Sequence, residues 1–371
     1  MKVAIIDADL CGVEKHRFPN LACEKISAYW KEKGADVELL ENYPTPIEWM
    51  LWDYDETYIS KVFTETPFPD YIEESERVHL GGTGFYFDKA PNLPNEIEHH
   101  MPDYHLYDKW IARRVEEEKA EKGKAYDEHK TMLQFKDYQD CSIGFLTRGC
   151  FRKCKFCVNQ KYDHVFQHSP LQEFYDPSRK RICLLDDNFF GCPNWKPMLQ
   201  ELMDTGKQFH FKQGLDERLL TEEKAEMLFK SNWFGDFIFA FDNVSDYNLI
   251  ESKLKIIRKY RGTRSVKFYV LVGFESTDVN DIENAFIRIE LLLKYGCLPY
   301  VMRYQSRDDK PYLKSPFKQI YINLARWCNQ PNIVKKMNFS EFCKASDINI
   351  EWFEKAYPKI TERYFKIKMQ K

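Results

Sequence analysis

The chain has 371 residues, of which 43% are apolar and 16% aromatic, a composition typical of globular rather than disordered proteins. Lys plus Arg number 55 and Asp plus Glu 58, so the formal charge of −3 shows no basic excess of the kind that nucleic-acid-binding proteins carry. The apolar run near the N-terminus is too short for the core of a signal peptide. No run elsewhere approaches the roughly 18 apolar residues of a membrane span. These features predict a cytoplasmic protein with no membrane partner and no strong nucleic-acid signal.

Residues 1–130 predict a small α/β unit followed by a charged linker. Asn20 is a typical helix cap and Gly34 a typical stop, which favours a helix between them. Strands and helical stretches alternate, which indicates a doubly wound parallel sheet. The nearly all-charged residues 113–130 predict a solvated helix and linker. The expected strands are Val3–Ile6, Val37–Leu40, Tyr58–Phe63 and Val78–Leu80.

Residues 131–310 predict a repeated strand–helix pattern, and residues 311–371 a short helical extension. The strand–helix unit recurs about every 30 residues, as a βαβ repeat requires. Asp278–Tyr295 is the clearest helix, because its apolar residues share one face. Six units are too few for a closed eight-stranded barrel, so a partial (β/α)6 barrel is expected. Its strands are expected at Ser142–Leu146, Ile182–Leu185, Gln208–Lys212, Phe237–Phe241, Val266–Val272 and Leu298–Met302.

Three of the eleven cysteines form one compact group. Cys150, Cys154 and Cys157 lie close together, directly after the first strand of the repeat. Closely spaced cysteines of this kind wrap a single iron–sulfur cluster. Because no fourth cysteine follows nearby, one iron of a cubane would stay open to a ligand, which makes the site reactive. Basic residues that favour an anionic cluster surround the thiols, and these are Arg148, Arg152, Lys153 and Lys155.

Two other interpretations of the three cysteines stay open. A Cys3His zinc site with His164 or His168 has plausible spacing, although structural zinc usually uses two separated ligand pairs. Alternatively, the three are ordinary free cysteines. That is the expectation for the eight scattered ones, which predict small buried apolar side chains. One of Cys183 and Cys192 is also a candidate reactive thiol, because the two flank the polar segment Asp186-Asp187.

The spacing Cys150-x3-Cys154-x2-Cys157, with Phe156 before the last cysteine, resembles the cluster loop of radical SAM enzymes. The resemblance covers about residues 140–305. It implies a [4Fe-4S] cluster that binds S-adenosylmethionine, whose reductive cleavage gives a 5′-deoxyadenosyl radical that abstracts hydrogen from a substrate. It implies that Phe156 packs beside the adenine, and that a reductant such as flavodoxin or ferredoxin is a partner. The substrate, small-molecule or macromolecular, is not identified by the sequence.

Polar residues follow the expected strands, at the ends where βα barrels bind ligands. By the resemblance, Asp186 and Asp187 lie where the methionyl amine is bound, although the family's Gly-Gly-Glu is not found there. Asp242 stands where a carboxylate meets the ribose hydroxyls, and Gly273 where the backbone approaches the adenine. Gln213, after the third strand, completes the expected cofactor-binding set. No catalytic residue is predicted beyond the cluster cysteines.

The N-terminal unit resembles the cobalamin-binding domain that precedes the barrel in one branch of this family. The usual Asp-x-His-x-x-Gly signature is not found, because Asp7 and Asp9 are followed by Cys11 and Gly12, with His16 out of step. Cobalamin is therefore not expected to be held by a histidine. We interpret the unit as a degenerate domain that shapes the substrate entrance.

Two alternative functions remain at this stage. A cobalamin-dependent methyltransferase would need corrin binding, and a methylthiotransferase would carry a second cysteine trio, which Cys11 and Cys23 do not form. Outside the family, the alternative is a non-catalytic iron–sulfur or zinc protein that is structural or senses redox state. No second cysteine group follows residue 160, so no auxiliary cluster is expected.

Overall fold

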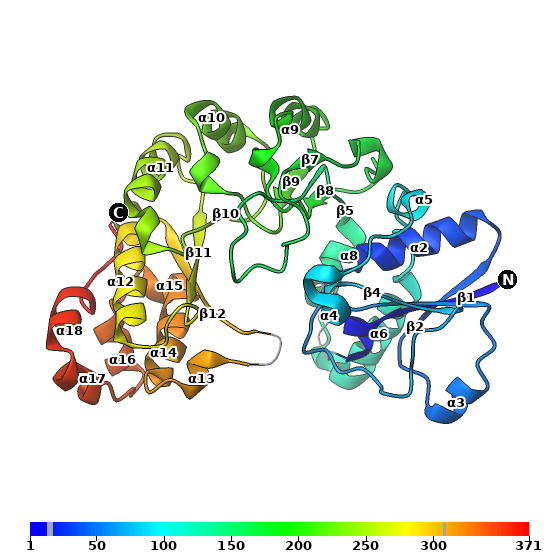
Figure 1. The fold of residues 1–371 in the computed structure, drawn as a ribbon, viewed down its shortest axis with the longest axis horizontal. Helices are drawn as coiled ribbons and strands as arrows, with labels where there is room; N and C mark the ends of the chain where they lie inside the picture. The colour runs from blue at the N-terminus through cyan, green and yellow to red at the C-terminus, as the bar shows by residue number, and fades with distance from the viewer. Residues whose placement is uncertain (13–17, 307–308, 371) are drawn as a thin grey trace.

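The computed structural model describes residues 1–12, 18–306 and 309–370. Its strands form parallel sheets covered by helices, so the fold is α/β, as predicted. Figure 1 shows the N-terminal unit in blue and cyan on the right, the green segments at the top, and the yellow to red segments on the left. In the part of the chain that is described, no helix is long and apolar enough to cross a membrane. His16, considered above as a cobalamin ligand, and Lys371 lie outside the described residues.

The N-terminal unit is built on a four-stranded parallel sheet in the order β2-β1-β3-β4. The central strand is buried along its length, because Val3, Ala4, Ile5 and Ile6 are all fully inaccessible to solvent. A continuous apolar run is what a strand covered on both faces requires. All four expected strands are confirmed, and they are β1 (Lys2–Asp7), β2 (Asp36–Leu40), β3 (Glu56–Ser60) and β4 (Val78–Gly81).

The predicted first long helix is α2 (Leu21–Glu32). Its N-cap is Asn20, whose side-chain oxygen accepts hydrogen bonds from the backbone N–H groups of Ala22 and Cys23. Gly34, with φ at +76°, follows its end. The other helices of this part are α1 (Ala8–Gly12), α3 (Pro46–Met50), α4 (Thr83–Tyr86), α5 (Asn95–Glu98), α6 (Asp108–Lys122), α7 (Glu128–Met132) and α8 (Lys136–Asp140).

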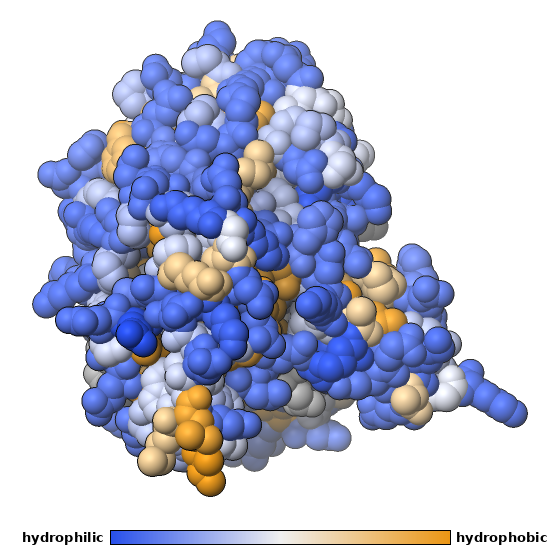
Figure 2. All heavy atoms as spheres, turned by 90° about the vertical axis from the view of Figure 1, so that its right-hand side faces the viewer, coloured by the Kyte–Doolittle hydropathy of each residue, from blue (hydrophilic) through white to orange (hydrophobic). Residues whose placement is uncertain are grey.

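The expected solvated helix is confirmed, since no residue of 113–130 is buried; the first turn of α6, which precedes this stretch, is buried. Trp110 and Ile111 pack in the same core as Phe135 and Tyr138. The N-terminal core therefore continues through α8. The face of this unit shown in Figure 2 is mainly hydrophilic.

Two three-stranded parallel sheets follow, where the sequence predicted a single partial barrel. Between them a parallel bridge joins Phe209 to Trp233, and the N–H of Leu215 donates to the carbonyl of Ile238 at 2.9 Å. The six predicted strands are confirmed, and they are β5 (Cys141–Gly144), β8 (Arg181–Leu184) and β9 (Gln208–Phe211) in one sheet and β10 (Phe237–Ala240), β11 (Val266–Val272) and β12 (Leu298–Arg303) in the other.

Helices cover the outer faces of these sheets and share one large core with the C-terminal segment. Helix α12 (Val279–Lys294) begins at Asp278, whose side chain accepts from two backbone N–H groups, as the predicted helix requires. The core includes Leu202, Phe268 and Trp327, so sheets and C-terminal helices form one packed body. The remaining helices are α9 (Trp195–Asp204), α10 (Glu222–Lys230), α11 (Tyr247–Tyr260), α13 (Pro311–Lys314), α14 (Lys318–Cys328), α15 (Pro331–Val334), α16 (Phe339–Ala345), α17 (Glu351–Ala356) and α18 (Pro358–Tyr364).

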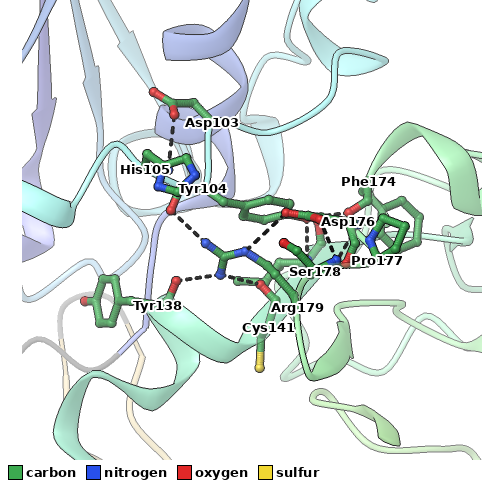
Figure 3. Close-up of polar contacts among 12 residues, drawn as sticks. Asp103, Tyr104, His105, Tyr138, Cys141, Phe174, Asp176, Pro177, Ser178 and Arg179 are labelled. Atoms are coloured by element: carbon green, nitrogen blue, oxygen red, sulfur yellow. Dashed lines mark hydrogen bonds and ion pairs between the residues drawn. The ribbon is translucent and has the colours of Figure 1, made fainter. Parts of the chain in front are cut away.

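A buried arginine joins the N-terminal unit to the first three-stranded sheet. The guanidinium of Arg179 donates to the carbonyl oxygens of Tyr138 at 2.6 Å, Cys141 at 3.0 Å and Tyr104 at 2.8 Å (Figure 3). The hydroxyl of Tyr104 in turn accepts a hydrogen bond from the N–H of Ile143 at 2.7 Å. One side chain thereby fixes three backbone segments relative to one another.

Candidate functional site

The three predicted cluster cysteines, Cys150, Cys154 and Cys157, share one loop. The loop leaves β6 (Thr147–Arg148) and returns at β7 (Phe166–Gln167), a short antiparallel pair that the sequence did not predict, and all three thiols are half-buried. Gly149 starts the turn with φ at +87°, a backbone conformation that favours glycine. Gln160 closes it, since its side-chain amide donates to the carbonyl oxygens of Cys154 at 2.6 Å and Cys157 at 2.9 Å.

Nitrogen donors point at two of the thiols. The backbone N–H of Arg152 and the side-chain amide of Asn188 each lie 3.4 Å from the sulfur of Cys150. The N–H of Asn159 lies 3.4 Å from the sulfur of Cys157. Burial raises the pKa of Cys157, and the hydrogen bond from Asn159 opposes that rise.

Asp186 and Asp187 tie this loop to the end of β8. Asp186 is fully buried and accepts from both the N–H and the hydroxyl of Thr147 at 2.6 Å. Asp187 accepts from the N–H of Gly149 at 2.9 Å and from the side-chain amide of Asn159 at 2.6 Å. Burial raises the pKa of Asp186 to about 7 and also raises the pKa of Asp187. Their oxygens are thus engaged by the protein, and both residues position the cysteine loop.

A pocket of about 340 Å³ lies between the cysteine loop and the ends of β10 and β11. Cys154 and Phe156 line it from the loop, while Asp242 and Arg288 line it from the sheet and α12. The ring of Phe156 meets that of Phe274 edge to face, with centroids 5.6 Å apart. The structure therefore brings three predicted site residues, Cys154, Phe156 and Asp242, around one pocket.

The other predicted cofactor residues do not line this pocket. Gln213 is exposed to solvent. Gly273 has φ at +73°, and its N–H donates to a carboxylate oxygen of Asp281 at 2.8 Å. Its neighbour Phe274 lines the pocket instead.

Two arginines that the sequence did not single out lie beside the cluster loop. Arg152 and Arg218 each donate to a different oxygen of Asp216, at 2.7 Å. Although burial opposes it, these ion pairs hold the pKa of Asp216 below its usual range. Arg218 lines the pocket and lies close enough to Cys154 to favour its thiolate, against the rise in pKa that burial causes. Two half-buried arginines, paired through Asp216, thus lie beside the cysteine loop.

A third arginine, Arg288, lines the pocket and is buried, unlike Arg152 and Arg218. The guanidinium of Arg288 donates to the carbonyl oxygens of Phe241 at 3.1 Å, Asp242 at 3.0 Å and Leu271 at 2.9 Å. The N–H of Leu271 donates to a carboxylate oxygen of Asp242 at 3.0 Å. Burial raises the pKa of Asp242, and the charge of Arg288 opposes that rise. This arrangement fixes the ends of β10 and β11, with Asp242 held at the pocket wall.

Glu217, also at the pocket, is 2% exposed and accepts a hydrogen bond from the N–H of Ala240 at 3.1 Å. Burial raises its pKa to about 8, from an ordinary 4.5. Between pH 4.5 and pH 8 the folded protein therefore keeps a proton on Glu217 that the unfolded chain has lost. The free energy of unfolding falls as the pH rises through this range.

We expect Glu217→Gln to remove this pH dependence, because the amide matches the protonated acid in shape. Between pH 4.5 and pH 9 the free energy of unfolding of the unmodified protein should fall relative to the variant by on the order of 2 kcal/mol or more. Urea titrations of both proteins across this range test it. Parallel pH profiles would contradict a buried, protonated Glu217.

The spacing of the possible ligand atoms can be compared with the spacing that a zinc site requires. Zinc–sulfur bonds of about 2.3 Å in a tetrahedron place thiolates about 3.8 Å apart. Among the described residues, ligand atoms within 4.8 Å of one another occur at Asp137, Cys141 and Cys183, and not at the cysteine loop with His164 or His168. The side-chain oxygen of Asn188, beside Cys150, is buried without a partner, as an acceptor awaiting a bound group would be. The described residues therefore show no Cys3His geometry at the cysteine loop, and the [4Fe-4S] cluster stays a prediction.

Comparison with known proteins adds no identification, since neither a protein-family model nor a curated protein matches the chain. The function is therefore argued from the site itself.

Proposed function

We propose that the protein is a radical SAM enzyme, with Cys150, Cys154 and Cys157 as ligands of a [4Fe-4S] cluster. The observation that carries the proposal is the pocket that Cys154 and Phe156 share with Asp242 at the strand ends. With S-adenosylmethionine bound, such a cluster supplies on one-electron reduction a 5′-deoxyadenosyl radical that abstracts hydrogen from a substrate.

The chain's own residues would hold and shield these groups. Arg152 and Arg218 compensate the negative charge of the cluster, and the N–H donors to Cys150 and Cys157 stabilise the thiolates. Phe156 is proposed beside the adenine, where Phe274 already packs against it. Asp242 is the proposed acceptor for the ribose hydroxyls.

The proposal includes a partial barrel for residues 131–310. The two three-stranded sheets would be halves of one curved sheet, since the Leu215–Ile238 hydrogen bond and the Phe209–Trp233 bridge join them. The parallel strands then run in the same sense, and their C-terminal ends meet at the pocket, as ligand sites of βα barrels do.

We retain a degenerate cobalamin-type domain as the proposal for residues 1–130. In the turn after β4, a Cβ on Gly82 would lie 2.2 Å from the carbonyl oxygen of Lys61, and a Cβ on Gly84 would lie 2.5 Å from the Lys61 side chain. The glycines thus serve close packing against the neighbouring loop. A flavodoxin or ferredoxin is the proposed reductant. No substrate is proposed.

We expect the anaerobically reconstituted protein to form 5′-deoxyadenosine from S-adenosylmethionine and a strong reductant. Cys157→Ala should lower this rate to background, because two thiolates and a water cannot hold the same cluster. Cys11→Ala is the matched control, since this half-buried thiol lies in the N-terminal unit, 3.6 Å from the carbonyl of Leu40. The measurement is 5′-deoxyadenosine per chain by liquid chromatography.

Iron content and colour separate the alternatives. A brown protein whose 5′-deoxyadenosine yield is unchanged by Cys157→Ala would contradict the assignment of the ligands. A colourless protein with one zinc per chain that Cys157→Ala removes would contradict the reaction class and favour the structural or sensing alternative.

A further inference from the structure

A second group of metal-ligand side chains lies outside the cysteine loop. Asp137 of α8, Cys141 of β5 and Cys183 of β8 place one ligand atom each within 4.8 Å of the others. The sulfur of Cys183 lies 2.7 Å from that of Cys141, which lies 3.9 Å from a carboxylate oxygen of Asp137. Both thiols are fully buried. The sulfur of Cys141 points away from Arg179, which binds only the backbone of that residue (Figure 3).

The strand register explains why these residues meet. Cys183 is paired with Ile143, two residues after Cys141, so all three side chains lie on one face of the sheet. The alternate residues Ile182 and Leu184 pack into the large core on the other face. The thiols therefore face the N-terminal unit, at the junction that α8 forms with the sheet.

His210, on the neighbouring strand β9, is a candidate fourth ligand that lies outside the 4.8 Å group. It is the register partner of Cys183 on β9, so its ring lies on the same face. The ring stacks on Phe234 with centroids 4.0 Å apart. Its Nε2 is buried and has no hydrogen-bond partner among the described residues. An imidazole nitrogen without a hydrogen-bond partner, on a ring that interacts with the Cys183 thiol, is a ligand that a metal ion could use.

The carboxylate of Asp137 has room for a second bond. Lys212 occupies one of its oxygens at 3.1 Å, and the other oxygen is the one turned to Cys141. The side chain of Asp137 is 28% exposed, which gives an ion a way in from solvent. The two sulfurs lie 2.7 Å apart, which is shorter than the about 3.8 Å between zinc-bound thiolates, so the two thiols would move apart on binding an ion.

We propose that these four side chains bind one Zn²⁺ ion at the junction of the N-terminal unit and the first sheet. Thiolate, imidazole and carboxylate are the ligand types that zinc uses, and four of them close a tetrahedral structural site. A disulfide would account for the two sulfurs but would use neither the carboxylate nor the histidine. The ion would link α8 to three successive strands. This site is separate from the cysteine loop and does not depend on the proposed function.

The test removes the loop cysteines so that the two sites cannot be confused. We expect a full-length variant with Cys150, Cys154 and Cys157 all replaced by alanine to retain one zinc per chain after dialysis. Adding Cys183→Ala should remove that zinc. Adding Cys192→Ala, a buried cysteine in the large core, should leave it in place. Elemental analysis gives the zinc content.

Cobalt substitution provides a measurement on a milder variant. In the loop variant, Co²⁺ should give intense thiolate absorption bands, and Asp137→Asn should weaken cobalt binding at least about tenfold while the fold is kept. Three results would overturn the proposal: a loop variant without zinc, zinc that survives Cys183→Ala, or an unreduced, denatured chain two hydrogens lighter than the reduced one. The last of these would establish a Cys141–Cys183 disulfide instead.

Discussion

Replacing Arg179 by methionine is expected to lower the free energy of unfolding by about 3 to 5 kcal/mol. Methionine fills much of the same space but leaves the carbonyl oxygens of Tyr104, Tyr138 and Cys141 without their donor. Each buried acceptor left without a partner costs about 1 to 3 kcal/mol. Arg179 is only 7% exposed, so water cannot replace it without opening the junction. Denaturant titration of the variant gives the difference.

Arg181→Met is the matched control for this effect. Arg181 lies two residues further on, its buried Nη1 has no hydrogen-bond partner, and its guanidinium sits over the ring of Phe234 at 5.0 Å. Its loss removes one cation–π contact, worth about 0.5 to 1 kcal/mol. Equal losses of free energy of unfolding in the two variants would mean that the effect comes from removing a charge near β8. The hydrogen bonds of Arg179 to the three carbonyl oxygens would then not explain the loss.

The secondary structure was predictable because its signals are local. Asn20 and Asp278 cap helices through side chains that bond to N–H groups two or three residues on, and the apolar runs of the strands are continuous in the sequence. The break between β9 and β10 carries no such signal. Whether their edges form a ladder depends on the path of residues 212–236 between them, and the partial barrel therefore stays a prediction.

That Cys150, Cys154 and Cys157 share one loop was predictable for the same reason, since they are close in the sequence, while the cluster that they would hold stays a prediction. The charged lining of the pocket was not predictable, because Glu217 and Arg288 reach it through tertiary packing. One signal was available: Asp281 and Arg288 stand seven residues apart on α12, on a face whose other residues are apolar and buried. The pair Cys141 and Cys183 lies 42 residues apart and meets only through strand register.

Gly149→Ala is expected to destabilise the protein by about 3 kcal/mol or more and to prevent iron from being retained after reconstitution. The left-handed backbone of Gly149 already disfavours a side chain, and the added Cβ would lie 2.3 Å from the carbonyl oxygen of His164 and 2.9 Å from the Cβ of Tyr162. The segment must shift to relieve that contact. Cys150 follows directly and would move with it, and the hydrogen bond from Gly149 to Asp187 would be lost. Iron per chain and denaturant titration measure the two effects.

Gly206→Ala is the control that separates the cost of the left-handed backbone from the cost of the steric contact made by the added Cβ. Gly206 has a similarly positive φ of +69°, but nothing lies within 4 Å of its added Cβ. Its substitution therefore carries only the cost of the left-handed conformation, about 1 to 2 kcal/mol, and should leave iron retention unchanged. The difference between the variants is the contribution of the close approach of the Gly149 and His164 segments, which positions Cys150, the first of the three proposed cluster ligands. Equal losses of stability with full iron retention in both would mean that Cys150 is positioned by other contacts, chiefly those of Asn188 and Arg152.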